Sequence, residues 1–305
     1  MLKSILQKSF ILFFLCVCFS STLAQTAVPE GGTVEKVYPG LSTGILKTAL
    51  LVPLKKGLVL SSEGMEMEES RLETLVAETD PAIREELKKN LFFLLEQKSA
   101  EMLLLREAKK RAQNKKASDQ EMIQAYLQEK FSILKASDGE IGNFYDQNKD
   151  SMSGMPLNMV KETIRDYLIQ QKKQEMVVNH IEELGRAKPI RLNADWVKKQ
   201  SVLAQDNPVD KARQSGKATL VEFGAVGCVP CDMMQPILQN LRKKYSQNLH
   251  VLFVNVREQN ILGARYGIRS IPAQVFFDKK GKEVFRHIGF YPEKEIDKKL
   301  AEIGI

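Results

Sequence analysis

The chain has 305 residues, which is long enough for two domains. Its 45 Lys and Arg residues outnumber 38 Asp and Glu residues, so the net charge is a mild +7. Basic residues alternate with acidic ones and are not interleaved with aromatic residues, which argues against a nucleic-acid-binding protein. The three histidines, His180, His250 and His287, are scattered without paired spacing, so we expect no metal site and no cofactor.

Residues 1–24 have the pattern of a secretory signal peptide. Lys3 and Lys8 precede a continuous apolar run at residues 10–19, and small residues then lead to Ala24. The run is shorter than the roughly 20 apolar residues of a spanning helix, so we expect cleavage near Ala24, with a retained membrane anchor as the alternative. The sequence therefore predicts an exported protein, periplasmic or secreted.

The next stretch divides by composition. Residues 25–65 carry no pattern that assigns a structure. Residues 66–192 are rich in Glu, Lys, Gln, Leu and Met, with apolar residues at helical spacing, and predict an all-α helical domain. Asp80 followed by Pro81 is typical of a helix start, and the apolar pattern after it predicts one long helix to about Lys115.

Three further helices are expected in this domain. Ser118 with Glu121, and Ser137 with Glu140, are two capping boxes, each of which starts a helix. The last helix covers residues 156–185. The apolar stripes on these helices have two interpretations: ordinary packing between helices, or a surface that holds client proteins or pairs two subunits in a homodimer.

These predicted helices resemble the N-terminal domain of SurA-type periplasmic foldases. The resemblance rests on residues 94–97, 103–110, 140–145, 164–168 and 187–192, of which the last segment is similar to that family's closing strand. No segment similar to a parvulin isomerase lies between them. The resemblance therefore implies a chaperone-like, client-holding module and not a prolyl isomerase.

The C-terminal third has a different composition. Residues 193–215 are expected to form a connector with a short leading helix, and in residues 216–305 short β-branched runs are separated by glycine. The predicted order is βαβαββα. Strands are expected at residues 218–223, 251–256, 273–278 and 283–288, and helices at 231–246, 261–266 and 293–303.

Cys228 and Cys231 are the only cysteines that would remain after export. In an oxidising compartment, a single close-spaced pair is more naturally catalytic than structural. Cys228 lies where a helix begins, and the positive end of the helix dipole can stabilise its thiolate, so we expect it to attack disulfides. Cys231, one turn later, is the expected resolving thiol that breaks the mixed disulfide.

This region resembles the thioredoxin family. The matching segments are Leu220-Val221-Glu222-Phe223, the motif from Cys228 to Cys231, Pro236, the segment from Tyr266 to Pro272, and Gly289. The resemblance implies an α/β thioredoxin fold for residues 216–305 and a redox-active disulfide between the two cysteines.

The same resemblance implies roles for the neighbouring residues. Glu222 stands where thioredoxins carry a buried aspartate and would accept the proton of Cys231; a surface carboxylate or a salt bridge is the alternative. Pro272 resembles the family's cis-proline, which leaves the backbone at Ile271 free to bind an extended substrate; a structural turn proline is the alternative. Gly227 replaces a tryptophan and would open the approach for protein substrates.

Two functions follow from these expectations. The first is an exported thiol-disulfide oxidoreductase that reduces or isomerises disulfides in exported proteins, with the helical domain holding clients or pairing two subunits. Residues 285–290 and the cysteine context resemble exported thioredoxins that accept electrons from a DsbD-like membrane reductase. The alternative is a non-catalytic periplasmic chaperone in which the thioredoxin domain is only a binding scaffold.

Overall fold

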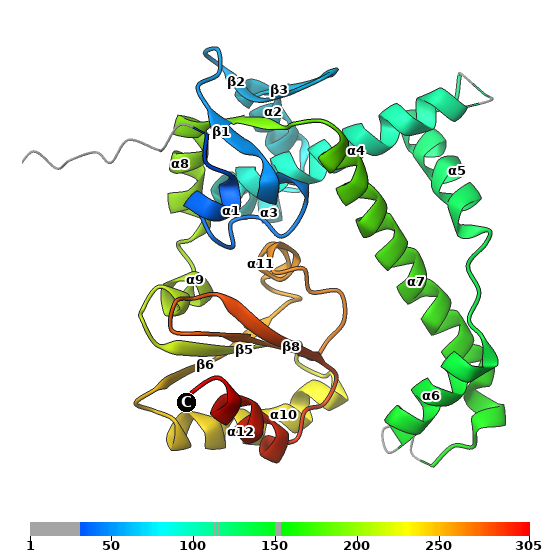
Figure 1. The fold of residues 1–305 in the computed structure, drawn as a ribbon, viewed down its shortest axis with the longest axis vertical. Helices are drawn as coiled ribbons and strands as arrows, with labels where there is room; N and C mark the ends of the chain where they lie inside the picture. The colour runs from blue at the N-terminus through cyan, green and yellow to red at the C-terminus, as the bar shows by residue number, and fades with distance from the viewer. Residues whose placement is uncertain (1–30, 113, 115, 150–153) are drawn as a thin grey trace, which may run out of the picture.

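The computed structural model describes residues 31–112, 114, 116–149 and 154–305, and the expected signal peptide lies outside them. Figure 1 shows two sheet-containing parts, one above the other, with a set of long helices beside them. We refer to them as the N-terminal part (residues 31–111 and 191–204), the helical arm (119–149 and 154–187) and, after the fold expected from its sequence, the thioredoxin domain (208–305). Within the described residues, no helix has the length and apolar character needed to cross a membrane.

The N-terminal part contains a four-stranded sheet in the order β1-β4-β2-β3. Its strands are β1 (Leu50–Val52), β2 (Leu58–Ser62), β3 (Met65–Glu68) and β4 (Arg191–Asn193). β4 pairs parallel with β1 and antiparallel with β2, so the chain returns to this sheet after its long helices. This region is largely helical, as expected, and β4 overlaps the segment at residues 187–192 that resembles a closing strand. The other three strands were not predicted, and the all-α description is wrong in that respect.

The β2–β3 hairpin has a clear local cause. It turns around Glu63 and Gly64, and the φ of Gly64 is +71°, a conformation that glycine adopts without strain. In β3 the two methionines are buried and the two glutamates are exposed, which is the two-residue period of a strand with one covered face. The alternating Met-Glu-Met-Glu sequence at residues 65–68 was the available signal.

The other elements of the N-terminal part are helical. They are α1 (Val34–Val37), η1 (Ile45–Thr48), α2 (Glu69–Glu78), α3 (Pro81–Lys89), α4 (Leu91–Arg111) and α8 (Ala194–Ala204). The single long helix expected to about Lys115 is instead two helices that meet at Asn90. The Asn90 side chain donates to the carbonyl of Glu86 at 2.9 Å, and its backbone leaves the helical region, with φ −122° and ψ 36°. Asparagine competes with the helical backbone in this way and interrupts the helix.

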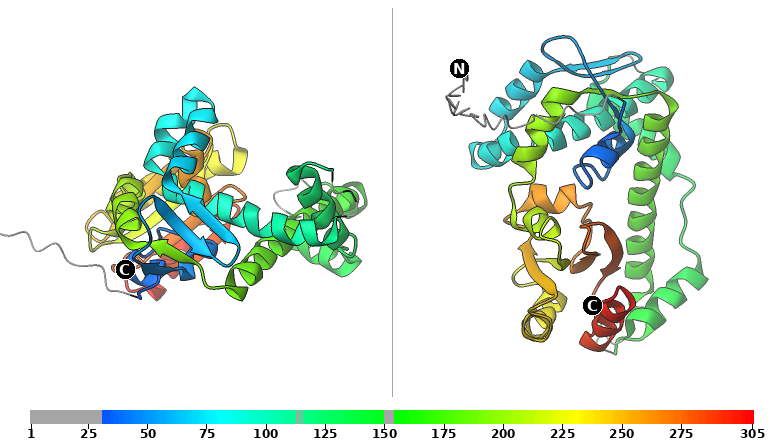
Figure 2. Two further views of the ribbon diagram at one scale, coloured as in Figure 1. Left: turned by 90° about the horizontal axis from the view of Figure 1, so that it is seen from above. Right: turned by 60° about the vertical axis from the view of Figure 1, so that its left-hand side comes forward.

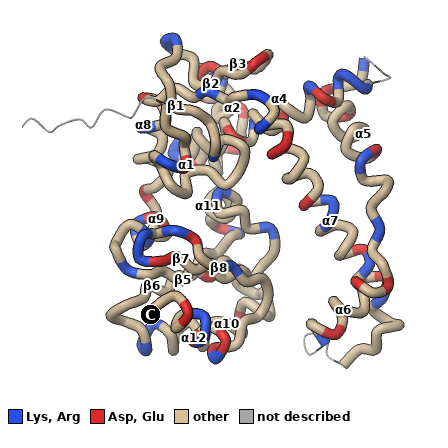
Figure 3. The backbone as a smooth tube through the Cα atoms, in the orientation of Figure 1, with Lys and Arg blue, Asp and Glu red and all other residues tan. Residues whose placement is uncertain are grey.

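The helical arm consists of α5 (Asp119–Phe131), α6 (Asp138–Asn148) and α7 (Leu157–Ala187). Both predicted capping boxes are present: Ser118 with Glu121 starts α5, and Ser137 with Glu140 starts α6. Figures 1 and 2 show α7 running along the length of the molecule, with α6 at its far end. Figure 3 shows both signs of charge along the arm. One ion pair joins Lys161 of α7 to Asp138 of α6 at 3.0 Å.

The core of the N-terminal part does not follow the expected boundaries at residues 66 and 193. One hydrophobic cluster contains Val34 and Leu51 from the first stretch, Phe92 from α4, and Trp196 from α8. The rings of Phe92 and Trp196 stack with their centroids 6.4 Å apart. Residues 34–65 and α8 therefore belong to the same folded unit as the helices between them.

The thioredoxin domain has the predicted βαβαββα order. After a short helix α9 (Pro208–Arg213) come β5 (Ala218–Gly224), α10 (Val229–Lys244), β6 (Leu249–Asn255), α11 (Asn260–Arg265), β7 (Ala273–Phe277), β8 (Glu283–Ile288) and α12 (Glu293–Glu302). The sheet order is β6-β5-β7-β8, with β5 parallel to β6 and antiparallel to β7. One hydrophobic cluster packs α10 and α12 on one face of the sheet, and another packs α9 and α11 on the other.

The N-terminal part and the thioredoxin domain are joined by a buried polar network. Asp210 of α9 accepts from Arg213 at 3.0 Å, from Arg265 at 3.2 Å and from the hydroxyl of Tyr266 at 2.7 Å. Arg265 also donates to the carbonyl of Ala204 in α8 at 2.6 Å. Ion pairs that are buried and hydrogen-bonded in this way fix geometry, so α11 is held against the N-terminal part.

Candidate functional site

Cys228 and Cys231 form a disulfide at the start of α10, with their Cα atoms 5.2 Å apart. Cys228 is the N-cap residue of α10 and is half-buried, whereas Cys231 lies in the first turn and is fully buried. Pro230 occupies the first turn, where a missing backbone N–H is tolerated. Only Cys228 is therefore open to a partner from outside, and the free N–H groups of the helix end lie next to it.

Two glycines before Cys228 shape the surroundings of the disulfide: one leaves it accessible from outside, and the other allows close packing against the sheet. Gly227 is exposed, with φ +77°, a conformation that favours glycine. Gly224, at the end of β5, has no room for a side chain: a Cβ there would lie 2.9 Å from Phe253 and 3.3 Å from the Cβ of Cys231. This glycine lets Cys231 lie directly against the sheet.

Glu222 lies two residues before Gly224 on β5, so both face the same side of the sheet, the side on which Cys231 packs. The Glu222 side chain is fully buried. It accepts one hydrogen bond, from Gln274 at 2.8 Å, and has no ion-pair partner in the described part of the chain. Burial raises the pKa of Glu222 to about 7, against a smaller lowering by Gln274. A carboxyl group with this pKa can take or release a proton at neutral pH.

The Ile271–Pro272 peptide bond is cis. Phe223 of β5 pairs with Ala273 of β7, so Pro272, one residue earlier, lies beside the end of β5 where Gly224 contacts Cys231. The carbonyl of Pro272 accepts from Gly289 at 2.8 Å. Among the described residues the backbone N–H of Ile271 has no hydrogen-bond partner, so it can bind another chain.

An apolar rim surrounds the cysteines. It was not predicted, and its residues are Val226, Val229, Met233 and Ile288, all of which are exposed. Ile288 pairs with Ala273, which places it next to Pro272. Val229 lies between the two cysteines in sequence, and Val226 and Met233 lie two residues before and after the motif. The sequence did contain a signal for this rim, because Val226 lies in the predicted loop before the cysteines and Val229 and Met233 lie near the start of the helix that follows. Exposed apolar residues that gather in one place are typical of a binding surface.

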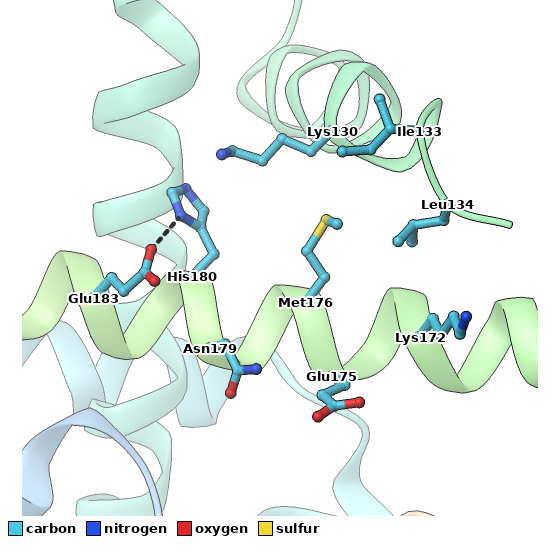
Figure 4. Close-up of a pocket in the computed structure, with 9 residues that line it drawn as sticks. All are labelled: Lys130, Ile133, Leu134, Lys172, Glu175, Met176, Asn179, His180 and Glu183. Atoms are coloured by element: carbon cyan, nitrogen blue, oxygen red, sulfur yellow. Dashed lines mark ion pairs between the residues drawn. The ribbon is translucent and has the colours of Figure 1, made fainter.

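A second candidate site lies on the helical arm (Figure 4). It is a groove of about 430 Å³ between α5 and α7. Figure 4 shows Met176 of α7 pointing into the space beside Ile133 and Leu134, with charged side chains at the edges. His180 hydrogen-bonds the hydroxyl of Tyr126 at 2.7 Å, and burial lowers the pKa of this histidine. Three of its nine lining residues, Ile133, Leu134 and Met176, are apolar, and the other six are charged or polar.

In the described residues, no group of three or more His, Cys, Asp or Glu side chains is arranged to hold a metal.

A family model described as "Thioredoxin-like domain" matches residues 205–304. A thioredoxin of Alicyclobacillus acidocaldarius is 34% identical over 98 residues, which cover 32% of this chain and 92% of that protein. A thioredoxin of Chlorobaculum thiosulfatiphilum is 39% identical over 88 residues, covering 29% of this chain and 81% of that protein. The match begins before α9, so the short helix expected within the connector belongs to the matched region.

Proposed function

Because the chain belongs to the thioredoxin family through its C-terminal domain, we propose that it is an exported thiol-disulfide oxidoreductase that reduces or isomerises disulfides in protein substrates. The observation that carries this proposal is the arrangement of the two cysteines. Cys228 is accessible at the start of α10, and Cys231 is buried against the sheet on the face that also carries Glu222. This asymmetry separates an attacking sulfur from a resolving one.

The reduction proceeds in two exchanges. The Cys228 thiolate attacks one sulfur of the substrate disulfide, forms a mixed disulfide and releases the other substrate sulfur as a thiolate. Cys231 then loses its proton to Glu222 and attacks the Cys228 sulfur, which releases the second substrate thiolate. Two electrons pass to the substrate, and the protein ends in the disulfide form that the structure shows.

The apolar rim and the Ile271 backbone form the proposed substrate surface. An unfolded segment can lie along Ile271 and Pro272 in an extended conformation, with its backbone bonded to the free N–H of Ile271. Exposed Gly227 leaves room for bulky segments, and the exposed Val229 can pack against their apolar side chains. This surface suits protein substrates of varied sequence, because backbone bonding does not depend on side-chain identity.

Export and the source of electrons are parts of the same proposal. The leader pattern of residues 1–24 supports a periplasmic or secreted protein. The dithiol form that reduces a substrate is left as the Cys228–Cys231 disulfide, which must be reduced again, and a DsbD-like membrane reductase would supply those electrons outside the cytoplasm.

We further propose that the helical arm holds clients, as its resemblance to SurA-type foldases implies, or pairs two subunits. The groove beside Met176 supports client holding, because its apolar side chains are surrounded by charged ones. Together the groove and the redox centre would hold a client while its disulfides are exchanged.

The redox proposal is tested by reduction of insulin with dithiothreitol as the electron donor. We expect the wild-type protein to accelerate precipitation of the insulin B chain and Cys228→Ser to abolish this activity. Cys231→Ser should instead accumulate mixed disulfides with exported proteins, because attack survives while resolution is lost. A wild-type protein that does not reduce insulin would favour the alternative, a non-catalytic chaperone with a thioredoxin scaffold. Equal trapping by Cys228→Ser would reverse the two cysteine roles.

Client holding is tested separately with the full chain carrying both Cys228→Ser and Cys231→Ser. This variant has no redox pair, so suppression of aggregation of a denatured client would come from binding alone. Its mass in solution, measured by light scattering, distinguishes a client-holding monomer from a homodimer. A monomer that leaves aggregation unchanged would remove both proposed uses of the arm.

A further inference from the structure

The partner of the buried carboxyl group is a neutral amide. Glu222 on β5 stands directly opposite Gln274 on β7, and both side chains are fully buried. The Nε2 of Gln274 donates to the Oε2 of Glu222 at 2.8 Å. The remaining oxygen of each group, Oε1 of Glu222 and Oε1 of Gln274, has no hydrogen-bond partner among the described residues.

Two buried acceptors without a donor are unfavourable, because each has lost its water and gained nothing. An ionised carboxylate cannot help, since it accepts hydrogen bonds and donates none. A protonated carboxyl group has one O–H to donate, and an amide oxygen accepts it. A single proton on Oε1 of Glu222 therefore gives both oxygens a partner, because the new O–H group can donate to Oε1 of Gln274.

We propose that Glu222 is protonated in the disulfide form and donates from Oε1 to Oε1 of Gln274, so that the two side chains form a cyclic acid–amide pair with two hydrogen bonds. Gln274 is then a positioning residue. It holds the carboxyl group in the plane and orientation in which one oxygen carries the proton. The role of that proton in exchange rests on the proposed function, whereas the pair itself does not.

The surroundings of the pair favour a neutral acid. Phe253 of β6 is opposite Glu222 on one side, and Cys231 of α10 packs on the same face of β5. His287 of β8 is opposite Gln274, and its ring bonds the carbonyl of Phe290 at 3.2 Å and stacks on Tyr291. Burial lowers the pKa of His287, so the imidazole is neutral at neutral pH. In the described chain no charged group shifts the pKa of Glu222.

The pair also balances the resolving step. When Cys231 attacks, its S–H bond breaks and an O–H bond forms on Glu222, while the electron pair on sulfur forms the bond to Cys228. The substrate sulfur leaves with the electrons of the mixed disulfide. The new O–H group donates a hydrogen bond to Oε1 of Gln274, so the oxidised protein keeps the proton on Glu222. The proton returns to Cys231 when a donor dithiol reduces the disulfide.

Infrared difference spectroscopy of the full-length oxidised protein tests the pair directly. We expect the carbonyl band of a protonated carboxyl group at pH 6, lost in Glu222→Gln and titrating with a midpoint near 7. In Gln274→Leu, which replaces the amide with an apolar side chain of similar size, the band should move to higher frequency because both hydrogen bonds are lost. Gln274→Met serves as a second variant should leucine not fold.

Thr219→Val is the matched control, since Thr219 is a buried residue of β5 whose hydroxyl also lacks a partner among the described residues. It lies an odd number of residues from Glu222 and so faces the other side of the sheet. We expect this substitution to leave the carboxyl band unchanged. A band that Glu222→Gln does not remove, or that stays in place in both Gln274 variants, would overturn the inference.

A kinetic readout separates this inference from the proposed function. Gln274→Leu removes the charge-assisted hydrogen bond of the ionised form of Glu222 as well as the two neutral hydrogen bonds of the protonated form. Gln274 lowers the pKa of Glu222 in the wild type, so we expect its removal to raise that pKa and to move the midpoint of the pH profile for mixed-disulfide decay upward. At pH 7 decay should slow roughly fivefold, with attack by Cys228 unchanged. A Gln274→Leu protein with an unmoved pH profile would refute the positioning role while insulin reduction still stands. A protein without insulin reduction but with the band shift would refute only the function.

Discussion

Glu96 on α4 and Glu222 on β5 are acidic side chains inside different parts of the protein, and they are held in opposite ways. Burial raises the pKa of both. One oxygen of Glu96 accepts from the hydroxyl of Ser42 at 2.5 Å and from the backbone N–H of Leu46 at 3.0 Å. Glu222 accepts from one amide only, and its other oxygen has no partner in the described residues.

This is the difference that we expect between a carboxyl group with a structural role and one with the proposed proton-transfer role. The donors to Glu96 come from the segment around η1, so that carboxyl group fixes a loop against α4. Moving a proton there would disturb several contacts at once. Glu222 has few contacts to disturb and lies on the face where Cys231 packs, so a change of protonation can be coupled to disulfide exchange.

The largest expected difference between the two carboxyl groups is in the rate of the resolving step. Glu222→Gln keeps size and shape but removes the base, so mixed-disulfide decay should slow by about 10²-fold, the lower end for general base catalysis because solvent reaches Gly227. Attack by Cys228 should be nearly unchanged. Stopped-flow measurement of both steps gives the rates, and Glu96→Gln is the control that leaves them unchanged. Equal decay in wild type and Glu222→Gln across roughly pH 6 to 9 would return Glu222 to a structural role.

The second effect is on the pH dependence of stability. The pKa of Glu222 is about 7 in the folded protein, above its ordinary value of 4.5. The folded protein therefore binds more protons than the unfolded chain between these values, and its stability falls as the pH rises from about 4.5 to 7. The loss amounts to about 3 kcal/mol. Glu222→Gln should lack this loss and be more stable than wild type above pH 7.

Urea unfolding of the oxidised proteins at several pH values measures this difference. The stability of wild type minus that of Glu222→Gln isolates the one carboxyl group, since the other titrating groups occur in both proteins. A difference that stays constant between pH 4.5 and 8 would show that Glu222 has an ordinary pKa.

The third effect concerns Glu96. Glu96→Leu leaves the hydroxyl of Ser42 and the N–H of Leu46 without their acceptor, which should cost about 2 kcal/mol of unfolding free energy at pH 7. Glu96→Gln retains an acceptor oxygen and should cost less. Urea unfolding gives the stabilities, and insulin reduction gives the activity, which we expect both variants to keep. Loss of activity in Glu96→Leu at temperatures where it is folded would remove the distinction between the two carboxyl groups.

The thioredoxin domain could be predicted because its signals are local and numerous. Strands β5, β6 and β7 are short, largely apolar runs bounded by glycine or a turn, and the cysteine motif fixes the start of α10. The capping boxes of α5 and α6 were equally readable, because serine and glutamate satisfy backbone groups only three residues apart.

The sheet of the N-terminal part could not be predicted in the same way. β1 and β4 have only three residues each, and their pairing joins Leu50 to Arg191 across the whole helical region. Such long-range pairing has no local pattern. The same limit applies to Gln274, whose importance depends on the register that places it opposite Glu222. A glutamine in an apolar strand was visible, but its partner was not.

The smallest expected effect tests the helical arm against the thioredoxin domain. Met176→Glu places a charge among the apolar side chains of the groove, beside Ile133 and Leu134. Since burial of a methionine contributes about 1.5–3 kcal/mol and Met176 is only half-buried in the groove, client holding should weaken roughly threefold to tenfold. The concentration of the protein carrying Cys228→Ser and Cys231→Ser that halves client aggregation, with and without Met176→Glu, measures this change. Insulin reduction by the same variant with its cysteines intact should be unchanged.

Met159→Glu is the matched control, because Met159 lies on the same helix, is 71% exposed and does not line the groove. It adds the same charge to α7, so any general effect of charge on client binding appears in both variants. A groove that holds clients predicts weakening in Met176→Glu alone. Equal weakening in both would point to electrostatics along the whole arm, and no weakening in either would place client holding elsewhere, with the apolar rim of the thioredoxin domain as the remaining candidate surface.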